Sequence, residues 1–184
     1  GVPQYTRHVD LCIDHHAGNS GYAEFTLLDG SAAAAAELLY EVICAMHVEI
    51  TPHIADCLYT GLSTDTGCFR FSSTKASTHI TAAKLMEAGA HVEELNTLLF
   101  DTKPRERMEA ERIARNHLEY HLDGRCALIY LTRDEIEQSR VDPADLEELT
   151  SLPISIEGVK VGLTLRQQPG GSYRISVRTA KGVD

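Results

Sequence analysis

The sequence predicts an α/β protein in which part of a parallel-sheet domain is followed by a smaller α+β domain. A short β-rich segment at 8–13 ends at a dense polar cluster, and several helical patterns follow it. A strand followed by helices at this spacing is typical of a parallel sheet. The last third of the chain is β-rich instead, which indicates a second architecture.

The first part of the chain contains two strand patterns and three helix patterns. The strand at 8–13 is expected to lie inside the sheet, and 24–28 is expected to be an edge strand. Ser31 is the expected N-cap of an alanine-rich helix whose apolar residues recur at helical spacing. Pro52 suits the first turn of a second helix. Helices are therefore expected at 31–46, 52–64 and 78–89.

The second part begins with a charged helix at 103–118 that has few apolar positions. An acidic helix is expected at 142–149. Strands are expected at 126–132, 159–167 and 173–179, and the turn residues Gln168 to Gly171 join the last two as a hairpin. We therefore predict a first domain at 1–102, a connector helix at 103–120 and a second domain at 121–184.

Only one strong interior-strand pattern precedes residue 100. A parallel sheet needs several strands, because both of its faces are buried. We therefore expect further strands of this sheet to lie upstream of Gly1.

Composition narrows the class of partner. The formal net charge is −10, from 17 Lys and Arg against 27 Asp and Glu, so any polyanion must be short or held by a local basic pocket. The 5 cysteines are scattered without a Cys-x-x-Cys pair, which favours reduced thiols and a cytoplasmic location. No apolar run reaches the length of a membrane span, so no membrane partner is expected.

Two polar clusters carry candidate chemistry. Asp14, His15 and His16 follow the first strand directly, at the sheet edge where ligands of α/β proteins bind. Imidazole and carboxylate together suit Mn²⁺ or a similar divalent ion. Asp65 lies where the second helix ends, an unusual place for a carboxylate unless a cation faces it. Taken separately, the first cluster also fits a polar turn, and Asp65 also fits a solvated turn.

Together these motifs resemble the DHH phosphoesterases, in particular the nanoRNase-like oligoribonucleases and phosphoadenosine phosphatases of the RecJ-like superfamily. The resemblance rests on VDLCIDHHAGN, on LYTGLSTDTGCFRFSS and on the closing VKVGLTLRQQPGGSYRISVRTAKGVD. It covers essentially the whole chain. It identifies 1–102 as part of a DHH domain and 121–184 as part of a DHH-associated, substrate-binding domain.

The resemblance implies a hydrolase with two Mn²⁺ ions in the complete protein, with Mg²⁺ or Co²⁺ as alternatives. His15 and Asp65 would be metal ligands, and His16 would contact the scissile phosphate. Asp14 and Asn19 would orient the histidines.

In the second domain the resemblance makes Arg178 a candidate for holding a substrate phosphate, and Arg166 a weaker one. Arg178 also fits a solvated arginine on an edge strand. The implied substrates are short oligonucleotides or small nucleotides, including adenosine 3′,5′-bisphosphate and dinucleotides. A homodimer is one expected assembly.

The chain departs from the family pattern in one respect. The aspartate motifs that precede the DHH element in the family, and the glycine-rich loop that follows, lie outside these 184 residues. We therefore expect a parent protein that is a phosphoesterase and a chain that is inactive by itself. The alternative is a non-catalytic binding or assembly module that keeps a vestigial DHH site and pairs through an exposed sheet edge.

Overall fold

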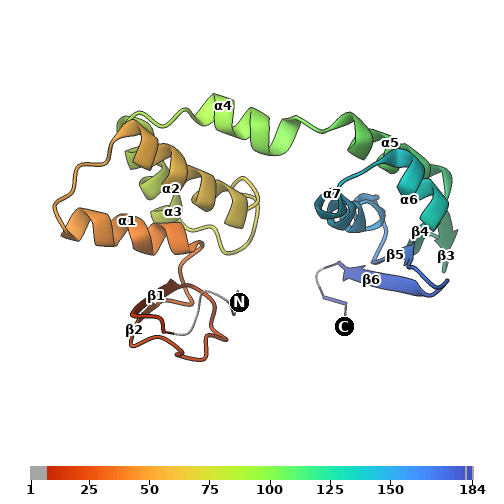
Figure 1. The fold of residues 1–184 in the computed structure, drawn as a ribbon, viewed down its shortest axis with the longest axis horizontal. Helices are drawn as coiled ribbons and strands as arrows, with labels where there is room; N and C mark the ends of the chain where they lie inside the picture. Colours follow the sequence, from red (N-terminus) through yellow and green to blue (C-terminus); the bar gives the residue numbers. More distant parts are fainter. Residues whose placement is uncertain (1–7, 181, 184) are drawn as a thin grey trace. The chain divides into compact units, whose positions relative to one another are not determined.

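The computed structural model describes residues 8–180 and 182–183 and divides the chain into two compact units, Gly1–Thr102 and Lys103–Asp184 (Figure 1). The predicted fold class is confirmed: parallel and mixed strand pairing occurs together with helices in an α/β arrangement.

The first unit contains a two-stranded parallel sheet and a set of helices (Figure 1). Its elements are β1 (Leu11–Asp14), β2 (Phe25–Leu28), α1 (Ala35–Ala45), α2 (Pro52–Asp65), α3 (Ala76–Glu87), α4 (Val92–Asn96) and the π-helical turn η2 (Thr97–Asp101). Leu11 pairs with Phe25, and Asp14 pairs with Leu28. Because the strands are parallel, the polar residues that follow both strands lie at the same edge of the sheet.

Apolar side chains of this small sheet remain accessible. Leu11 is 57% exposed and its partner Phe25 is 64% exposed. Parallel sheets are normally covered on both faces. Within the described residues, these two strands therefore present an uncovered apolar surface.

The core of the first unit lies among helices α1, α2 and α3. Helix α2 contributes Ala55, Leu58, Tyr59 and Leu62, which are all buried. These positions are spaced by three and four residues, so they form one stripe along the helix. Burial of this stripe fixes the direction of α2 and hence the position of its last residue, Asp65.

Helix α1 begins later than predicted. Its N-cap is Ala34, not Ser31, because Asp29 holds the preceding residues in a turn: Asp29 Oδ1 accepts the Ser31 amide at 2.8 Å. The buried carboxylate of Glu37 accepts the Ala33 amide at 2.7 Å instead. A side chain in the first turn of the observed helix thus satisfies a backbone donor that the predicted serine cap was expected to satisfy.

The second unit is a four-stranded mixed sheet with helices. Its elements are α5 (Arg105–Asn116), β3 (Glu119–His121), β4 (Cys126–Leu131), α6 (Arg133–Ser139), α7 (Pro143–Glu148), the 3₁₀ turns η3 (Leu149–Ser151) and η4 (Pro153–Ser155), β5 (Val161–Gln167) and β6 (Tyr173–Thr179). The strand order is β3-β4-β5-β6. The central pair β4–β5 is parallel, and the two outer pairs are antiparallel.

Helix α5 is not a solvated connector. Ala110 and Ala114 are fully buried and pack with Ile129 and Leu131 of β4. The small alanine side chains allow the helix to approach the sheet closely. The helix therefore forms part of the core of the second unit. This role was not predicted, because most residues of α5 are charged and its buried positions are small alanines.

None of the helices in the described part of the chain combines the length and the apolar character needed to cross a lipid bilayer. All five cysteines are free thiols.

Candidate active site

Two predicted site residues of the first unit come together. His15 follows the last residue of β1, and Asp65 is the last residue of α2. His15 Nε2 lies 3.4 Å from Asp65 Oδ2, and the side chains are 18% and 45% exposed respectively. An imidazole nitrogen and a carboxylate oxygen are thus held close together at a surface that solvent reaches.

The other ring nitrogen of His15 has a backbone partner. His15 Nδ1 lies 3.4 Å from the carbonyl oxygen of Ala32, which can accept a hydrogen bond from it. A histidine that donates from Nδ1 keeps its lone pair on Nε2 when the ring is neutral. The nitrogen facing Asp65 is therefore the one available to a cation.

The residues after Asp65 hold the end of α2 in place. The buried Thr66 hydroxyl donates to the carbonyl of Leu62 at 2.7 Å and accepts the amide of Phe69 at 3.0 Å. Gly67 follows with a positive φ of 56°, which glycine adopts without steric cost. This turn ends the helix and leaves the Asp65 carboxylate directed toward His15.

His16 is held by Asp14. The two side chains meet at 2.7 Å between His16 Nδ1 and Asp14 Oδ1, and the His16 amide also donates to this oxygen at 3.0 Å. Asn19 donates to Asp14 Oδ2 at 2.6 Å. These hydrogen bonds, from Asn19 foremost and then from His16, hold the pKa of the Asp14 carboxyl well below its usual range.

The predicted pair of orienting residues therefore acts on one histidine. Asp14 and Asn19 form a connected set with His16, whereas His15 is held by Ala32 and Asp65. The two imidazole rings lie 4.5 Å apart, edge to face. The His16 side chain is 76% exposed, so it extends from this cluster toward solvent.

The donor set of His15 and Asp65 fits a divalent cation. Two bonds of about 2.1 Å that meet at an angle between octahedral and tetrahedral separate their donor atoms by roughly 3.0 to 3.4 Å. The observed distance of 3.4 Å between Nε2 and Oδ2 falls at the upper end of this range. No third histidine, cysteine or acidic side chain among the described residues joins this pair to form a cluster.

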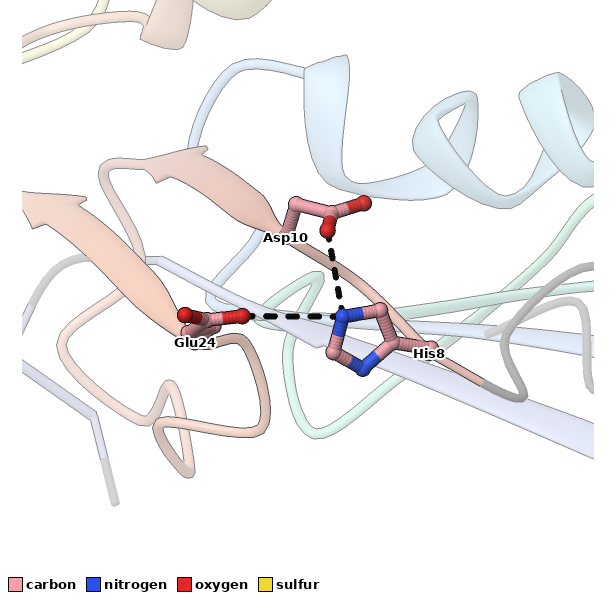
Figure 2. Close-up of side chains that lie close together, drawn as sticks. All are labelled: His8, Asp10 and Glu24. Carbon is pink, nitrogen blue, oxygen red and sulfur yellow. Dashed lines mark hydrogen bonds and ion pairs between the residues drawn. The ribbon is translucent and has the colours of Figure 1, made fainter.

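A separate group of three side chains that could hold a metal ion lies at the opposite end of β1 and β2. Figure 2 shows one ring nitrogen of His8 facing both Asp10 and Glu24, and His8 Nε2 lies 3.1 Å from Asp10 Oδ1 and 3.6 Å from Glu24 Oε2. All three residues precede their strands and are exposed. The sequence did not reveal this cluster, because it depends on the parallel register of β1 and β2.

In the second unit, the predicted residues Arg166 and Arg178 have very different surroundings. Arg166 of β5 is buried, and its Nη2 donates to Glu147 Oε1 at 2.6 Å. Arg178 of β6 is exposed. A third arginine, Arg174, was not predicted as a site residue, and its Nη1 lies 3.1 Å from the same oxygen of Glu147. The register of the predicted hairpin places Arg174 opposite Arg166, and this pairing could have identified Arg174 from the sequence.

The comparisons with known proteins confirm the predicted resemblance of this chain to the DHH phosphoesterases. The structure matches a crystal structure of an exopolyphosphatase-related protein from Bacteroides fragilis with a TM-score of 0.83 and 25% identity. The match covers 94% of this chain and 51% of that one. A scan against protein-family models finds no match.

Within this class, the sequence is similar to proteins named bifunctional oligoribonuclease and PAP phosphatase NrnA. The protein of that name from Thermus thermophilus is 29% identical over 171 residues, which cover 93% of this chain and 51% of the relative. A probable NrnA from Streptococcus mutans is 25% identical over 167 residues, with coverage of 91% and 53%. The chain therefore spans about half the length of the curated relatives it matches.

Proposed function

We propose that the parent protein is a metal-dependent phosphoesterase that hydrolyses phosphate esters of short oligonucleotides or small nucleotides. The observation that carries this proposal is the approach of His15 Nε2 to Asp65 Oδ2 at 3.4 Å. The similarity to relatives named oligoribonuclease and PAP phosphatase supports the substrate class.

In this proposal His15 and Asp65 hold a divalent cation, for which Mn²⁺ is our first choice. A bound cation of this kind lowers the pKa of a coordinated water and polarises phosphoryl oxygens. Two donors leave most of the coordination sphere open. Further carboxylate ligands are therefore needed for an active centre, and we expect the 184-residue chain to be inactive by itself.

His16 is proposed to contact the scissile phosphate. Asp14 engages Nδ1 of His16 at 2.7 Å and thereby fixes the ring plane. The opposite ring nitrogen, Nε2, is then free of this contact, and in the doubly protonated ring it can donate to a phosphate oxygen. Asn19 completes this arrangement by holding the second oxygen of Asp14.

Arg178 and Arg166 are proposed to bind the substrate. Guanidinium groups match phosphate geometry with paired hydrogen bonds. They also supply local positive charge on a chain whose formal net charge is −10. Free thiols throughout the chain support the cytoplasmic location that we include in the proposal.

The experiment that tests this function is an assay of the protein encoded by the complete gene. Short oligoribonucleotides, dinucleotides and adenosine 3′,5′-bisphosphate would be supplied with Mn²⁺, Mg²⁺ or Co²⁺. We expect hydrolysis of at least one substrate and a loss of at least about a hundredfold in kcat/KM for His15→Ala or Asp65→Asn. Absence of hydrolysis across the whole panel, or full activity of His15→Ala, would overturn the proposal.

A second candidate is a binding or assembly module without catalysis. The exposed apolar residues of β1 and β2, such as Leu11 and Phe25, favour it because such a surface can pack against another chain. Light scattering of the purified chain distinguishes the candidates when combined with the assay. An assembly that depends on Phe25, with no hydrolysis by the complete protein, supports the module.

A further inference from the structure

Three arginines share a single face of the β5–β6 hairpin, and two of them contact one carboxylate. Arg166 lies opposite Arg174 in the register, and Gly162 lies opposite Arg178. Side chains at alternate positions of a strand share one face, so Arg174 and Arg178 lie on the same face as Arg166. Glu147 of α7 faces this group and contacts two of the guanidinium groups through one oxygen, at 2.6 Å and 3.1 Å.

The charges in this group do not balance. Three guanidinium groups carry three positive charges, whereas Glu147 carries one negative charge. The three arginines, Arg166 most strongly, hold the pKa of Glu147 below its usual range, so it remains ionised. The net local charge is positive on a chain that is acidic as a whole.

Donor groups on this face also lack partners. Nε of the buried Arg166 and the buried hydroxyl of Thr164 have no hydrogen-bond partner among the described residues. Thr164 lies two positions before Arg166 on β5 and pairs with Ser176 of β6. Buried donors without partners are costly, and they are often explained by a ligand or an ordered water.

The strand β6 leaves one side of this face open. The Arg166 side chain is only 5% exposed, whereas the Arg174 side chain is 59% exposed and Glu147 is 48% exposed. An incoming anion can therefore reach the β6 arginines from solvent. It would displace the Glu147 carboxylate from its position beside Arg174.

We propose that Glu147 makes the phosphate-binding arginines of the proposed function select a terminal phosphate monoester over phosphodiesters, and that Arg174 is one of these arginines. The inference rests on the proposed function, because it assigns the chemical class of the substrate group that the second unit holds. Arg174 becomes a further binding residue, and Glu147 becomes a specificity-determining one.

The physical reason is a comparison of charges. A phosphodiester carries one negative charge, as the Glu147 carboxylate does, so a diester gains little by displacing it. A phosphate monoester has a second pKa near 6 and carries up to two negative charges above that pH. It also offers three acceptor oxygens to the guanidinium groups. Only the monoester is therefore expected to bind the arginines more strongly than the Glu147 carboxylate does.

The experiment measures binding without catalysis. Adenosine 5′-monophosphate, a monoester, and adenosine 3′,5′-cyclic monophosphate, a diester, are titrated into the 184-residue chain at pH 7.5 in EDTA by calorimetry. Unphosphorylated adenosine serves as the probe for base binding alone. We expect the monoester to bind at least about tenfold more tightly than the diester.

Two variants test the assignment of residues. Arg174→Gln is expected to weaken monoester binding about tenfold, and its exposure makes this variant compatible with folding. Glu147→Gln is expected to tighten diester binding and to reduce the preference for the monoester to a few fold. Glu148→Gln is the matched control on the same helix, because Glu148 lies near Arg107 instead, and it should leave the ratio unchanged.

Equal binding of the two nucleotides overturns the inference, as does unchanged monoester binding by Arg174→Gln. If Glu147→Gln does not fold, the Arg174→Gln result still decides whether this face binds phosphate, and the nucleotide comparison decides the selectivity. Selective binding together with no hydrolysis by the complete protein would remove the proposed function and leave this inference standing. Hydrolysis that depends on His15, with no effect of Arg174→Gln on binding, would support the proposed function and remove this inference.

Discussion

His15 Nε2 and Asp65 Oδ2 lie 3.4 Å apart although the two residues belong to different elements, the end of β1 and the end of α2. The backbone carbonyl of Ala32 and the turn at Thr66 hold the two side chains from behind. This arrangement leaves one nitrogen and one oxygen facing the same point. It is the geometry on which the proposed metal site depends.

The first prediction concerns Mn²⁺ binding by the chain itself. Because two protein donors make a weak site, we expect detectable but weak binding that His15→Ala or Asp65→Asn removes. Electron paramagnetic resonance of Mn²⁺ measures it, in a His8→Ala background that removes the exposed His8 cluster. His91→Ala is the matched control, because His91 and Asp56 form a similar surface pair at 3.0 Å without a proposed role. Equal loss in the control would contradict the assignment.

The second prediction concerns the support of His16. Asn19→Ala removes the hydrogen bond that contributes most to the lowered pKa of Asp14. We expect the pKa of Asp14 to rise toward its usual value, because the carboxylate loses a donor that favours its charged form. Titration of the side-chain carboxyl signals by NMR measures the change. If the pKa of Asp14 is the same in the variant and in the unsubstituted chain, Asn19 does not act on this carboxylate.

The third prediction is a pH dependence of stability from Asp56 and His91. Hydrogen bonding to His91 lowers the pKa of Asp56, and the same pair raises the pKa of His91. The Asp56 contribution is therefore present above its usual pKa and lost as pH falls through the folded value. The His91 contribution is present below its usual pKa and lost as pH rises through the folded value.

The pair should therefore stabilise the fold most between about pH 4 and pH 6.5. Asp56→Asn is expected to lower the melting temperature more at pH 5.5 than at pH 8.5, as measured by circular dichroism. Glu87→Gln is the control, since Glu87 pairs with Lys84, which stays charged throughout this range. A loss that is the same at both pH values would exclude the ion pair as its cause.

The fourth prediction concerns Gly162, which lies opposite Arg178 in the sheet. A Cβ atom at this position would lie 2.8 Å from the backbone nitrogen of Ile154 and 3.1 Å from Cβ of Pro153. Gly162→Ala should therefore reduce the free energy of unfolding by about 1–3 kcal/mol, since backbone must move to admit the methyl group. Urea denaturation measures this change.

The control for this substitution is Gly18→Ala. No atom lies within 4 Å of a Cβ placed at Gly18, so its effect should stay within about 0.5 kcal/mol. If Gly162→Ala proves as stable as this control, η4 and β5 are less tightly packed than the structure shows.

Sequence patterns were most informative where a local rule decides the structure. Apolar residues at helical spacing predicted α1, and Pro52 marked the start of α2. The QPGG turn predicted the β5–β6 hairpin. The local rules failed for α6, which was not predicted, although the capping box of Thr132 and Glu135 was present in the sequence. A single helix of seven residues offers too little apolar periodicity to be recognised.

By itself, the sequence determined the α/β class, the main helices and the kinds of side chain available for chemistry, because each of these depends on neighbouring residues and on the resemblance that the motifs carry. Only the tertiary structure decided which side chains meet. The family resemblance paired His15 with Asp65, but the distance between them, the sharing of Glu147 by Arg166 and Arg174, and the burial of α5 depend on segments that are distant in the chain. Such contacts follow from packing and strand register, which no local pattern encodes.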